Sequence, residues 1–333
     1  MEASLILTYR CNARCKMCHT WQYPSRRDDE FRPALIKKLP SGLKFINITG
    51  GEPFLREDIN AVLETALTKT RRLVISTNGY YTDRIMGAAE AFGNRIGFRI
   101  SLEGLPATND RLRGLEKGFE HGLRSLLMLQ KAGLKDLGFG ITVSDENATD
   151  LIDLFHLSES MGMEFATAVV HNSFYFHIND NKLAFPQRIA DALERLAVEM
   201  LRSRRPKNWF RAYFNMGLAN RVKIGPRPLP CSVGYDVFFL DPFGNILPCN
   251  GSKTPLIMGN LHEQDFTAIW HGQKAKRVRQ SVKTCLRQCW MIGSAAPAMK
   301  RHLLLPSTWI FRNKWRLFKN SRRKVNLEPV ADR

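Results

Sequence analysis

Three absences limit what this chain of 333 residues can be. It has no uninterrupted apolar run near the roughly 18 residues that a transmembrane helix needs. Its amino terminus, MEASLILTY, lacks the basic segment and long apolar core of a secretory signal, which predicts a cytoplasmic protein. Its seven cysteines are few for the length, odd in number and gathered in two groups, which excludes a disulfide framework. In a reducing compartment, grouped cysteines indicate metal binding or redox chemistry.

Acidic residues are also scarce: 31 Asp and Glu stand against 50 Lys and Arg, a formal net charge of +19. Part of the excess lies in the tail from Lys300 onward, where Phe311, Trp315 and Phe318 recur at helical spacing among basic residues. Such a helix can pack its aromatic stripe on the protein, lie on an anionic membrane surface, or bind nucleic acid. From the sequence we favour packing, and we favour nucleic acid least.

Six short apolar runs, each followed by a segment of helical length, organise the first half of the chain. They lie at residues 4–9, 43–49, 72–77, 96–102, 137–143 and 164–170. Six strand-then-helix units indicate a parallel α/β architecture, and their regular succession favours a barrel or partial barrel over a doubly wound sheet. Polar or glycine-rich stretches follow the first four runs, where barrels carry their functional sites.

The pattern changes after about residue 205. The chain becomes rich in Gly and Pro, and FFLDPFGNILPC at 238–249 predicts a β-hairpin around a Pro-Phe-Gly-Asn turn. The predicted domains are an α/β barrel at 1–215, a small unit of hairpin and helix at 216–299, and a basic aromatic tail at 300–333.

The first cysteine group, Cys11, Cys15 and Cys18, follows the first predicted strand, and no further cysteine occurs before Cys231. Thiolates suit zinc or an iron–sulfur cluster, because both metals are soft enough to prefer sulfur. For zinc, His19 is the nearest fourth ligand, but two directly adjacent side chains are awkward for tetrahedral coordination of one ion. A four-iron cluster held by three thiolates leaves one iron open for a substrate or cofactor. We therefore favour an iron–sulfur cluster with a vacant coordination position.

The second cysteine group consists of Cys231, Cys249, Cys285 and Cys289. Taken alone, four cysteines beside a hairpin are compatible with a zinc ribbon or with one iron–sulfur cluster whose irons are all ligated. A fully ligated cluster cannot bind substrate directly, which favours a role in electron transfer or structural support. Between these cysteines, Ile269 and Trp270 lie in a segment that predicts a turn followed by a helix, and we expect them in the core.

The chain resembles the radical S-adenosylmethionine (SAM) superfamily. The resemblance rests on Cys-x3-Cys-x2-Cys after the first strand and on GGEP at 50–53 after the second, and it covers residues 4 to about 170. It implies a partial, TIM-like (β/α)6 barrel, in agreement with the six units. The second cysteine group, which surrounds Gly244, resembles the SPASM/Twitch extension that follows many of these barrels. Four cysteines match a Twitch-like arrangement with a single auxiliary cluster.

The resemblance also implies roles for individual residues. Cys11, Cys15 and Cys18 would hold a [4Fe–4S] cluster whose open iron binds SAM, and the second cysteine group would hold an auxiliary [4Fe–4S] cluster. Met17 stands where the family usually has an aromatic residue near the adenine, and ordinary strand-end capping is the alternative for Ser76 and Ser101. The residues implied to contact SAM are Met17, Gly50, Gly51, Glu52, Pro53, Ser76, Asn78, Ser101 and Glu103.

By this resemblance the chain is an enzyme that reductively cleaves SAM to a 5′-deoxyadenosyl radical and abstracts hydrogen from a substrate carbon. The auxiliary cluster would assist the oxidation or modification of a small, carrier-linked or lipid-linked substrate. A peptide maturase is the alternative within enzymes, and a zinc-stabilised nucleic-acid-binding protein is the alternative from another class. A leader-gripping domain would have to be separate, because the chain begins almost at the first strand. The expected partners are a reducing donor such as flavodoxin or ferredoxin and, through the tail, the inner face of a membrane.

Overall fold

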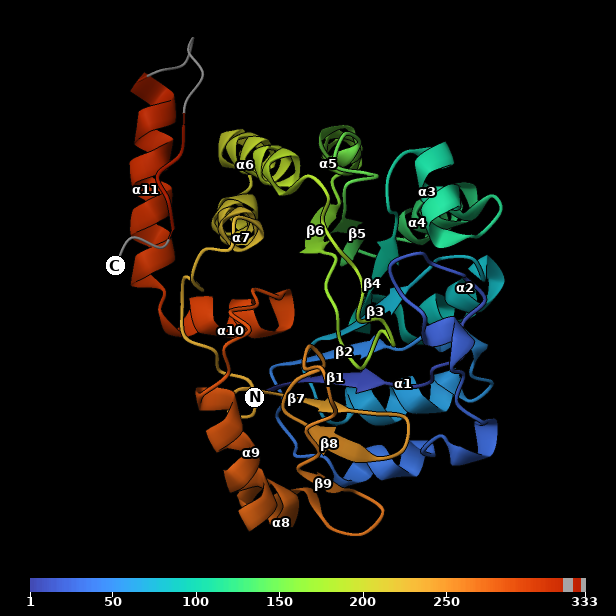
Figure 1. Ribbon diagram of the computed structural model, residues 1–333. Coiled ribbons are helices and arrows are strands. Elements are labelled where there is room, and N and C mark those ends of the chain that lie inside the picture. Colours follow the sequence, from blue (N-terminus) through green and yellow to red (C-terminus); the bar gives the residue numbers. More distant parts are fainter. Residues whose placement is uncertain (320–325, 331–333) are drawn as a thin grey trace.

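The computed structural model describes residues 1–319 and 326–330, and in them a single sheet of nine strands has the order β6-β5-β4-β3-β2-β1-β7-β8-β9 (Figure 1). The first six strands run parallel in chain order, which confirms the predicted α/β architecture. They are β1 (Glu2–Ile6), β2 (Phe45–Thr49), β3 (Leu73–Thr77), β4 (Ile96–Ser101), β5 (Leu137–Val143) and β6 (Glu164–Val169). The sheet is open at β6 and β9, as a partial barrel requires.

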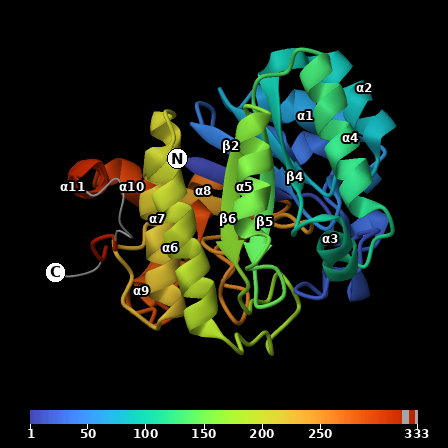
Figure 2. The same cartoon turned by 90° about the horizontal axis from the view of Figure 1, so that it is seen from above.

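Helices cover the outer side of the curved sheet (Figure 2). In α1, buried Ile59, Val62, Leu63 and Ala66 recur at intervals of three and four, which gives the helix one apolar face toward the sheet. The helices of this half are α1 (Ile59–Leu67), α2 (Thr82–Phe92), α3 (Pro106–Arg113), α4 (Gly118–Lys131), α5 (Leu151–Ser160), α6 (Pro186–Arg202) and α7 (Pro206–Val222). Short 3-10 helices lie at Thr20–Gln22, Arg27–Asp29, Pro33–Lys38, Pro53–Leu55 and Gly93–Arg95.

The predicted hairpin is present as β7 (Val237–Leu240) and β8 (Asn245–Leu247), followed by the short antiparallel strand β9 (Gly259–Asn260). The sequence did not show that β7 pairs in parallel with β1, so that the hairpin extends the barrel sheet. The proposed domain boundary after residue 215 lies inside α7.

The C-terminal helices are α8 (Phe266–His271), α9 (Gln273–Lys283), α10 (Ile292–Arg301) and α11 (Leu304–Lys319). Ile269 and Trp270 are buried in the core, as predicted. The favoured prediction that the aromatic stripe of the tail packs on the protein was wrong. α11 packs on α7 and α6 through a face that includes Trp309 and Ile310, which leaves the stripe exposed.

The part of the chain that the structure describes contains no helix both long and apolar enough to cross a membrane.

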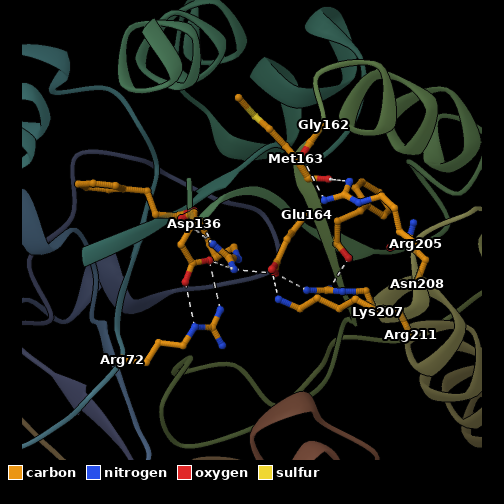
Figure 3. A network of polar contacts seen from close by, with 12 residues as sticks. Arg72, Asp136, Gly162, Met163, Glu164, Arg205, Lys207, Asn208 and Arg211 are labelled. Carbon is orange, nitrogen blue, oxygen red and sulfur yellow. Dashed lines mark hydrogen bonds and ion pairs between the residues drawn. The ribbon is translucent and has the colours of Figure 1, made fainter. Parts of the chain in front are cut away.

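A partly buried network of charges lies at the N-terminal end of the barrel strands (Figure 3). Arg99 of β4 donates from Nη2 to Asp136 Oδ1 and to Glu164 Oε2, each at 2.6 Å. Glu164, at the start of β6, also accepts from Lys207 and from Arg211 Nη2 of α7, the latter at 2.7 Å. These contacts attach α7 to the sheet on the side opposite the C-terminal strand ends.

We expect Glu164→Gln to lower the free energy of unfolding by about 3 kcal/mol, because three cations lose their shared carboxylate. Urea unfolding of the iron-free protein measures the change. Glu57→Gln is the control, since Glu57 pairs with Arg27 on the exposed surface and its loss should cost under about 1 kcal/mol. Equal effects of the two substitutions would contradict a structural role for the network.

Candidate functional site

The three cysteines of the first group lie in the loop that follows β1, each partly buried and none in a disulfide. Backbone hydrogen bonds join this loop to the end of α3, because Arg14 N donates to Arg113 O and Lys16 N to Leu112 O, both at 2.9 Å. The loop is therefore attached to the barrel before any metal binds.

Burial raises the pKa of the Cys11 thiol to about 12 and that of Cys15 to about 11. In the iron-free protein these thiols are neutral at physiological pH. Metal binding releases their protons, since thiolates are the metal-ligating form.

Gly50 and Gly51 allow the end of β2 to lie directly against the cysteine loop. A Cβ atom on Gly51 would meet the carbonyl oxygen of Arg10 at 2.2 Å, and one on Gly50 would meet that of Thr8 at 2.7 Å. Gly50 also has a φ of 155°, which side-chain-bearing residues rarely adopt. The two glycines thus bring two neighbouring strand ends together, and both line the cavity described below.

Glu52 is completely buried and joins the ends of β2 and β3. Its carboxylate accepts from Thr77 Oγ1 at 2.7 Å, from Asn78 N at 2.8 Å and from Phe54 N at 3.1 Å. Burial raises the pKa of Glu52, although these hydrogen bonds favour its charged form. Neither Glu52 nor Pro53 lines the cavity, so the structure places both behind the cavity wall rather than on it.

The remaining residues implied to contact SAM lie on the cavity wall: Met17, Ser76, Asn78, Ser101 and Glu103. Ser76 Oγ donates to Asn47 Oδ1 at 3.0 Å, and Asn78 Nδ2 donates to Asn12 Oδ1 at 2.7 Å. The C-terminal ends of β1 to β4 therefore meet at one site, as the sequence predicted.

A buried ion pair between Glu103 and Arg113 stands beside the cysteines. The pair joins Arg113 Nη1 to Glu103 Oε1 at 3.1 Å, while Glu103 Oε2 accepts from Thr142 N at 2.6 Å. Although burial opposes the charge of Arg113, Cys15 and Glu103 raise its pKa, and Arg113 Nε has no partner in the described residues. From the sequence, Arg113 and Gly114 indicate at most a helix-face salt bridge or a loop contact for Arg113, and the structure shows that the salt bridge is with Glu103.

The second cysteine group contributes to the same cavity, which has a volume of about 830 Å³. Cys249 and Cys289 line it together with the first group, whereas Cys231 and Cys285 are exposed. Burial and the neighbouring thiols of Cys289, Cys231 and Cys285 raise the pKa of Cys249 to about 12, so the four lie close together. No three His, Cys, Asp or Glu side chains among the described residues have the spacing for a single metal ion.

The loop at 170–183, which follows β6, joins the two cysteine-bearing segments. Tyr175 Oη donates to Gly50 O at 2.9 Å beside the first group. On the other side, Arg287 Nη2, between Cys285 and Cys289 in the sequence, donates to Asn172 O at 2.6 Å. Sequence analysis missed this loop because its aromatic and polar residues follow no recognisable motif.

Comparison with known proteins agrees with this geometry. The radical SAM superfamily model matches residues 5–157, and an iron–sulfur cluster-binding domain model, SPASM, matches residues 231–291. The chain therefore carries a radical SAM domain and, in its C-terminal part, a SPASM-type domain. These two domains imply a SAM-binding [4Fe–4S] cluster and auxiliary iron–sulfur binding. The matches favour iron–sulfur chemistry over the zinc alternative.

Three curated relatives represent the enzymes that the chain resembles. It is 36% identical to Fe-coproporphyrin III synthase of Methanosarcina barkeri, over 46% of this chain and 39% of that protein. It is 26% identical to the AdoMet-dependent heme synthase of Nitratidesulfovibrio vulgaris, over 82% and 79%. It is also 26% identical to the mycofactocin maturase MftC of Mycolicibacterium smegmatis, over 84% and 73%. The matched segment spans only about two fifths of Fe-coproporphyrin III synthase.

Two solved structures share the fold. Native anSMEcpe with bound AdoMet has a TM-score of 0.63 at 15% identity, covering 98% of this chain and 93% of that one. Streptococcus suis SuiB has a TM-score of 0.63 at 14% identity, covering 100% and 77%. These similarities confirm the radical SAM fold class.

We expect Arg113→Met to lower the free energy of unfolding by about 3–5 kcal/mol, because it leaves the Glu103 carboxylate buried without its cation. Adding Glu103→Met should recover much of the loss. Urea unfolding of the iron-free single and double variants measures this coupling. Arg111→Met is the control, since Arg111 lies on the exposed side of the same helix. Additive effects of the two core substitutions would show that the pair is not coupled.

Proposed function

We propose that the chain binds SAM at a [4Fe–4S] cluster held by Cys11, Cys15 and Cys18, and begins radical oxidation or modification of a substrate carbon. The observation that supports this most is the single cavity lined by all three cysteines and by the ends of β2, β3 and β4. When bound, the cluster supplies one electron that splits SAM into methionine and a 5′-deoxyadenosyl radical, which abstracts hydrogen from the substrate. The residues present fit such a cluster, because one loop supplies three free thiols and the cation Arg113 lies beside them.

The protein's own residues position and shield these groups. Gly50 and Gly51 let the backbone of one strand end approach the cysteine loop, and Glu52 holds the next strand end in place. Arg113 offsets negative charge that would gather on the thiolates, because its charge lowers the pKa of Cys15. We propose that Met17, Gly50, Gly51, Ser76, Asn78, Ser101 and Glu103 contact SAM, whereas Glu52 and Pro53 support the wall from behind.

For the second cysteine group we propose one auxiliary [4Fe–4S] cluster with all its irons ligated by protein. Its place in the same cavity supports a role as acceptor of the electron that an oxidised substrate must lose. We retain 1–215, 216–299 and 300–333 as the proposed functional division of the chain.

Two substrate classes have support. The heme synthases aligned over about four fifths of this chain favour oxidation of a small molecule. The maturases AlbA, SkfB and MftC, and the solved complex of SuiB with its precursor peptide SuiA, favour a peptide. We propose the small-molecule class first and the peptide maturase second. Either reaction needs a low-potential donor, for which we propose flavodoxin or ferredoxin.

The triple variant Cys11→Ala, Cys15→Ala, Cys18→Ala should abolish 5′-deoxyadenosine formation, because the SAM-binding cluster loses every protein ligand. It should retain about four of the roughly eight irons of the reconstituted protein. Anaerobic assays of 5′-deoxyadenosine, iron and sulfide test both statements. Cys249→Ala is the matched control and should lose iron from the other site. Continued SAM cleavage in the triple variant would overturn the proposed function.

We propose further that α11 rests on an anionic membrane surface. Phe311 and Phe318 are 73% and 82% exposed on the face that does not pack, and Trp315 lies between them. Lys319 Nζ lies 3.7 Å from the centre of the Trp315 ring, so positive charge accompanies the apolar stripe. An exposed aromatic face with cations on a strongly basic protein is complementary to acidic lipid.

The triple variant Phe311→Ser, Trp315→Ser, Phe318→Ser should therefore lose most of its sedimentation with vesicles that contain phosphatidylglycerol. The parent should bind them more weakly at high salt and bind phosphatidylcholine vesicles poorly. Phe185→Ser, which removes an exposed aromatic side chain elsewhere, is the control. If the triple variant and the parent sediment equally, the membrane role is wrong.

A further inference from the structure

The part of the cavity between the two cysteine groups carries positive charge without matching carboxylates. Arg221 at the end of α7, Lys253 after β8 and Arg287 all line it. Among the described residues, none of these three cations forms an ion pair with a carboxylate. The acidic residue on the wall, Glu103, is already paired with Arg113. No carboxylate among the described residues therefore balances these cations, although Arg287 also acts on the thiol of Cys289.

Arg287 is the most constrained of the three. Its Nη2 atom donates to Asn172 O at 2.6 Å, which fixes the guanidinium against the loop at 170–183. Its Nη1 atom is buried and has no hydrogen-bond partner in the described residues. A buried donor without a partner costs free energy, so the arrangement is favourable only when a bound group accepts from Nη1.

His171 lies next to Arg287 and also lines the cavity. Its Nδ1 lies 3.2 Å from Val169 O, and because a carbonyl oxygen can only accept, Nδ1 carries the proton. Its buried Nε2 has no partner in the described residues. Burial and the charge of Arg287 lower the pKa of His171, whereas an anion beside the ring would favour the protonated form that donates from Nε2.

The wall around these polar atoms is apolar. Apolar side chains come from the end of α7, from β7 and the residues before it, and from the segment after Arg287: Leu218, Val222, Val233, Phe239, Trp290 and Met291. A ligand that contacts the apolar side chains and also accepts a hydrogen bond from Arg287 has an apolar body and one anionic end.

We infer that the substrate of the proposed reaction is an organic anion, whose carboxylate or phosphate group is bound by Arg287 Nη1 with His171 next to it, while Arg221 adds positive charge elsewhere on the same cavity wall. That the bound anion is the substrate rests on the proposed function, whereas the anion site itself is inferred from the residues of the cavity wall alone. Arg287 and His171 act here as positioning residues that set where the apolar body lies between the two cysteine groups.

The test compares two probes with the same apolar body and different charge. 8-Anilinonaphthalene-1-sulfonate carries an anionic group, and N-phenyl-1-naphthylamine is its neutral counterpart. Anaerobic equilibrium dialysis with the reconstituted full chain gives the dissociation constant of each. In Arg287→Gln, loss of a charge-assisted hydrogen bond should weaken binding of the sulfonate by about tenfold. Arg221→Gln removes a second positive charge from the cavity wall and should weaken binding of the sulfonate in the same direction. The neutral probe should change by less than about twofold, because it makes no such bond.

Arg188→Gln, an exposed substitution on α6, is the control and should change neither dissociation constant. Dodecanoate, dodecyl phosphate and dodecanol, which share one alkyl chain, are then compared as competitors of the sulfonate. The stronger of the two charged competitors shows whether the site prefers a carboxylate or a phosphate. The inference is wrong if dodecanol displaces the probe as well as both anions do. It is also wrong if the arginine substitutions raise the dissociation constants of the sulfonate and of the neutral probe by the same factor.

Iron and sulfide analysis of the variants separates anion binding from support of the auxiliary cluster. Should Arg287→Gln lose iron, Arg221→Gln alone decides, because Arg221 lies on α7 and not between two cysteines of the second group. A parent that binds the sulfonate selectively but never cleaves SAM would overturn the proposed function and leave the anion site intact.

Discussion

The arrangement of this protein depends on β1, which is hydrogen-bonded on both of its edges, to β2 on one side and to β7 on the other. The first cysteine loop leaves the C-terminal end of β1. β7 runs parallel to β1 and β8 returns antiparallel, so Cys249, which follows β8, lies near the start of β7. The first cysteine group therefore lies at the C-terminal end of β1, whereas Cys249 lies near the N-terminal end of the neighbouring strand β7, and both groups line the cavity.

Burial in this cavity determines which side chains can carry a charge. It keeps the thiols neutral in the absence of metal, and it makes a buried donor without a partner, such as Arg287 Nη1, costly. Glu103 compensates Arg113, which stabilises the wall beside the first cysteine group. Arg287 has no such carboxylate in the described residues, and its partial satisfaction by Asn172 leaves one donor for a ligand. One buried environment thus surrounds both the neutral thiols near Cys15 and the unpartnered donor of Arg287.

The loop at 170–183 couples these two regions because it contacts both. Tyr175 of this loop donates a hydrogen bond to Gly50 beside the first cysteine group, and Asn172 accepts one from Arg287 beside the second. A substrate held by Arg287 would therefore lie against the same loop that borders the proposed SAM site. The matches to a radical SAM domain and a SPASM domain are consistent with two cysteine groups that share one cavity.

Local patterns in the sequence determined the strands, the hairpin and the two cysteine groups, because alternation, turn chemistry and ligand spacing are properties of short segments. Gly50 and Gly51 were recognisable for the same reason. Only the tertiary structure decided that β7 joins β1, that Arg113 reaches Glu103, and that Glu52 stands behind the wall, since these contacts join residues that no local period relates. The tail shows the limit most clearly. Helical spacing identified the aromatic stripe of α11, but which face is buried depends on where Trp309 and Ile310 meet α7, and that is a property of the assembled fold.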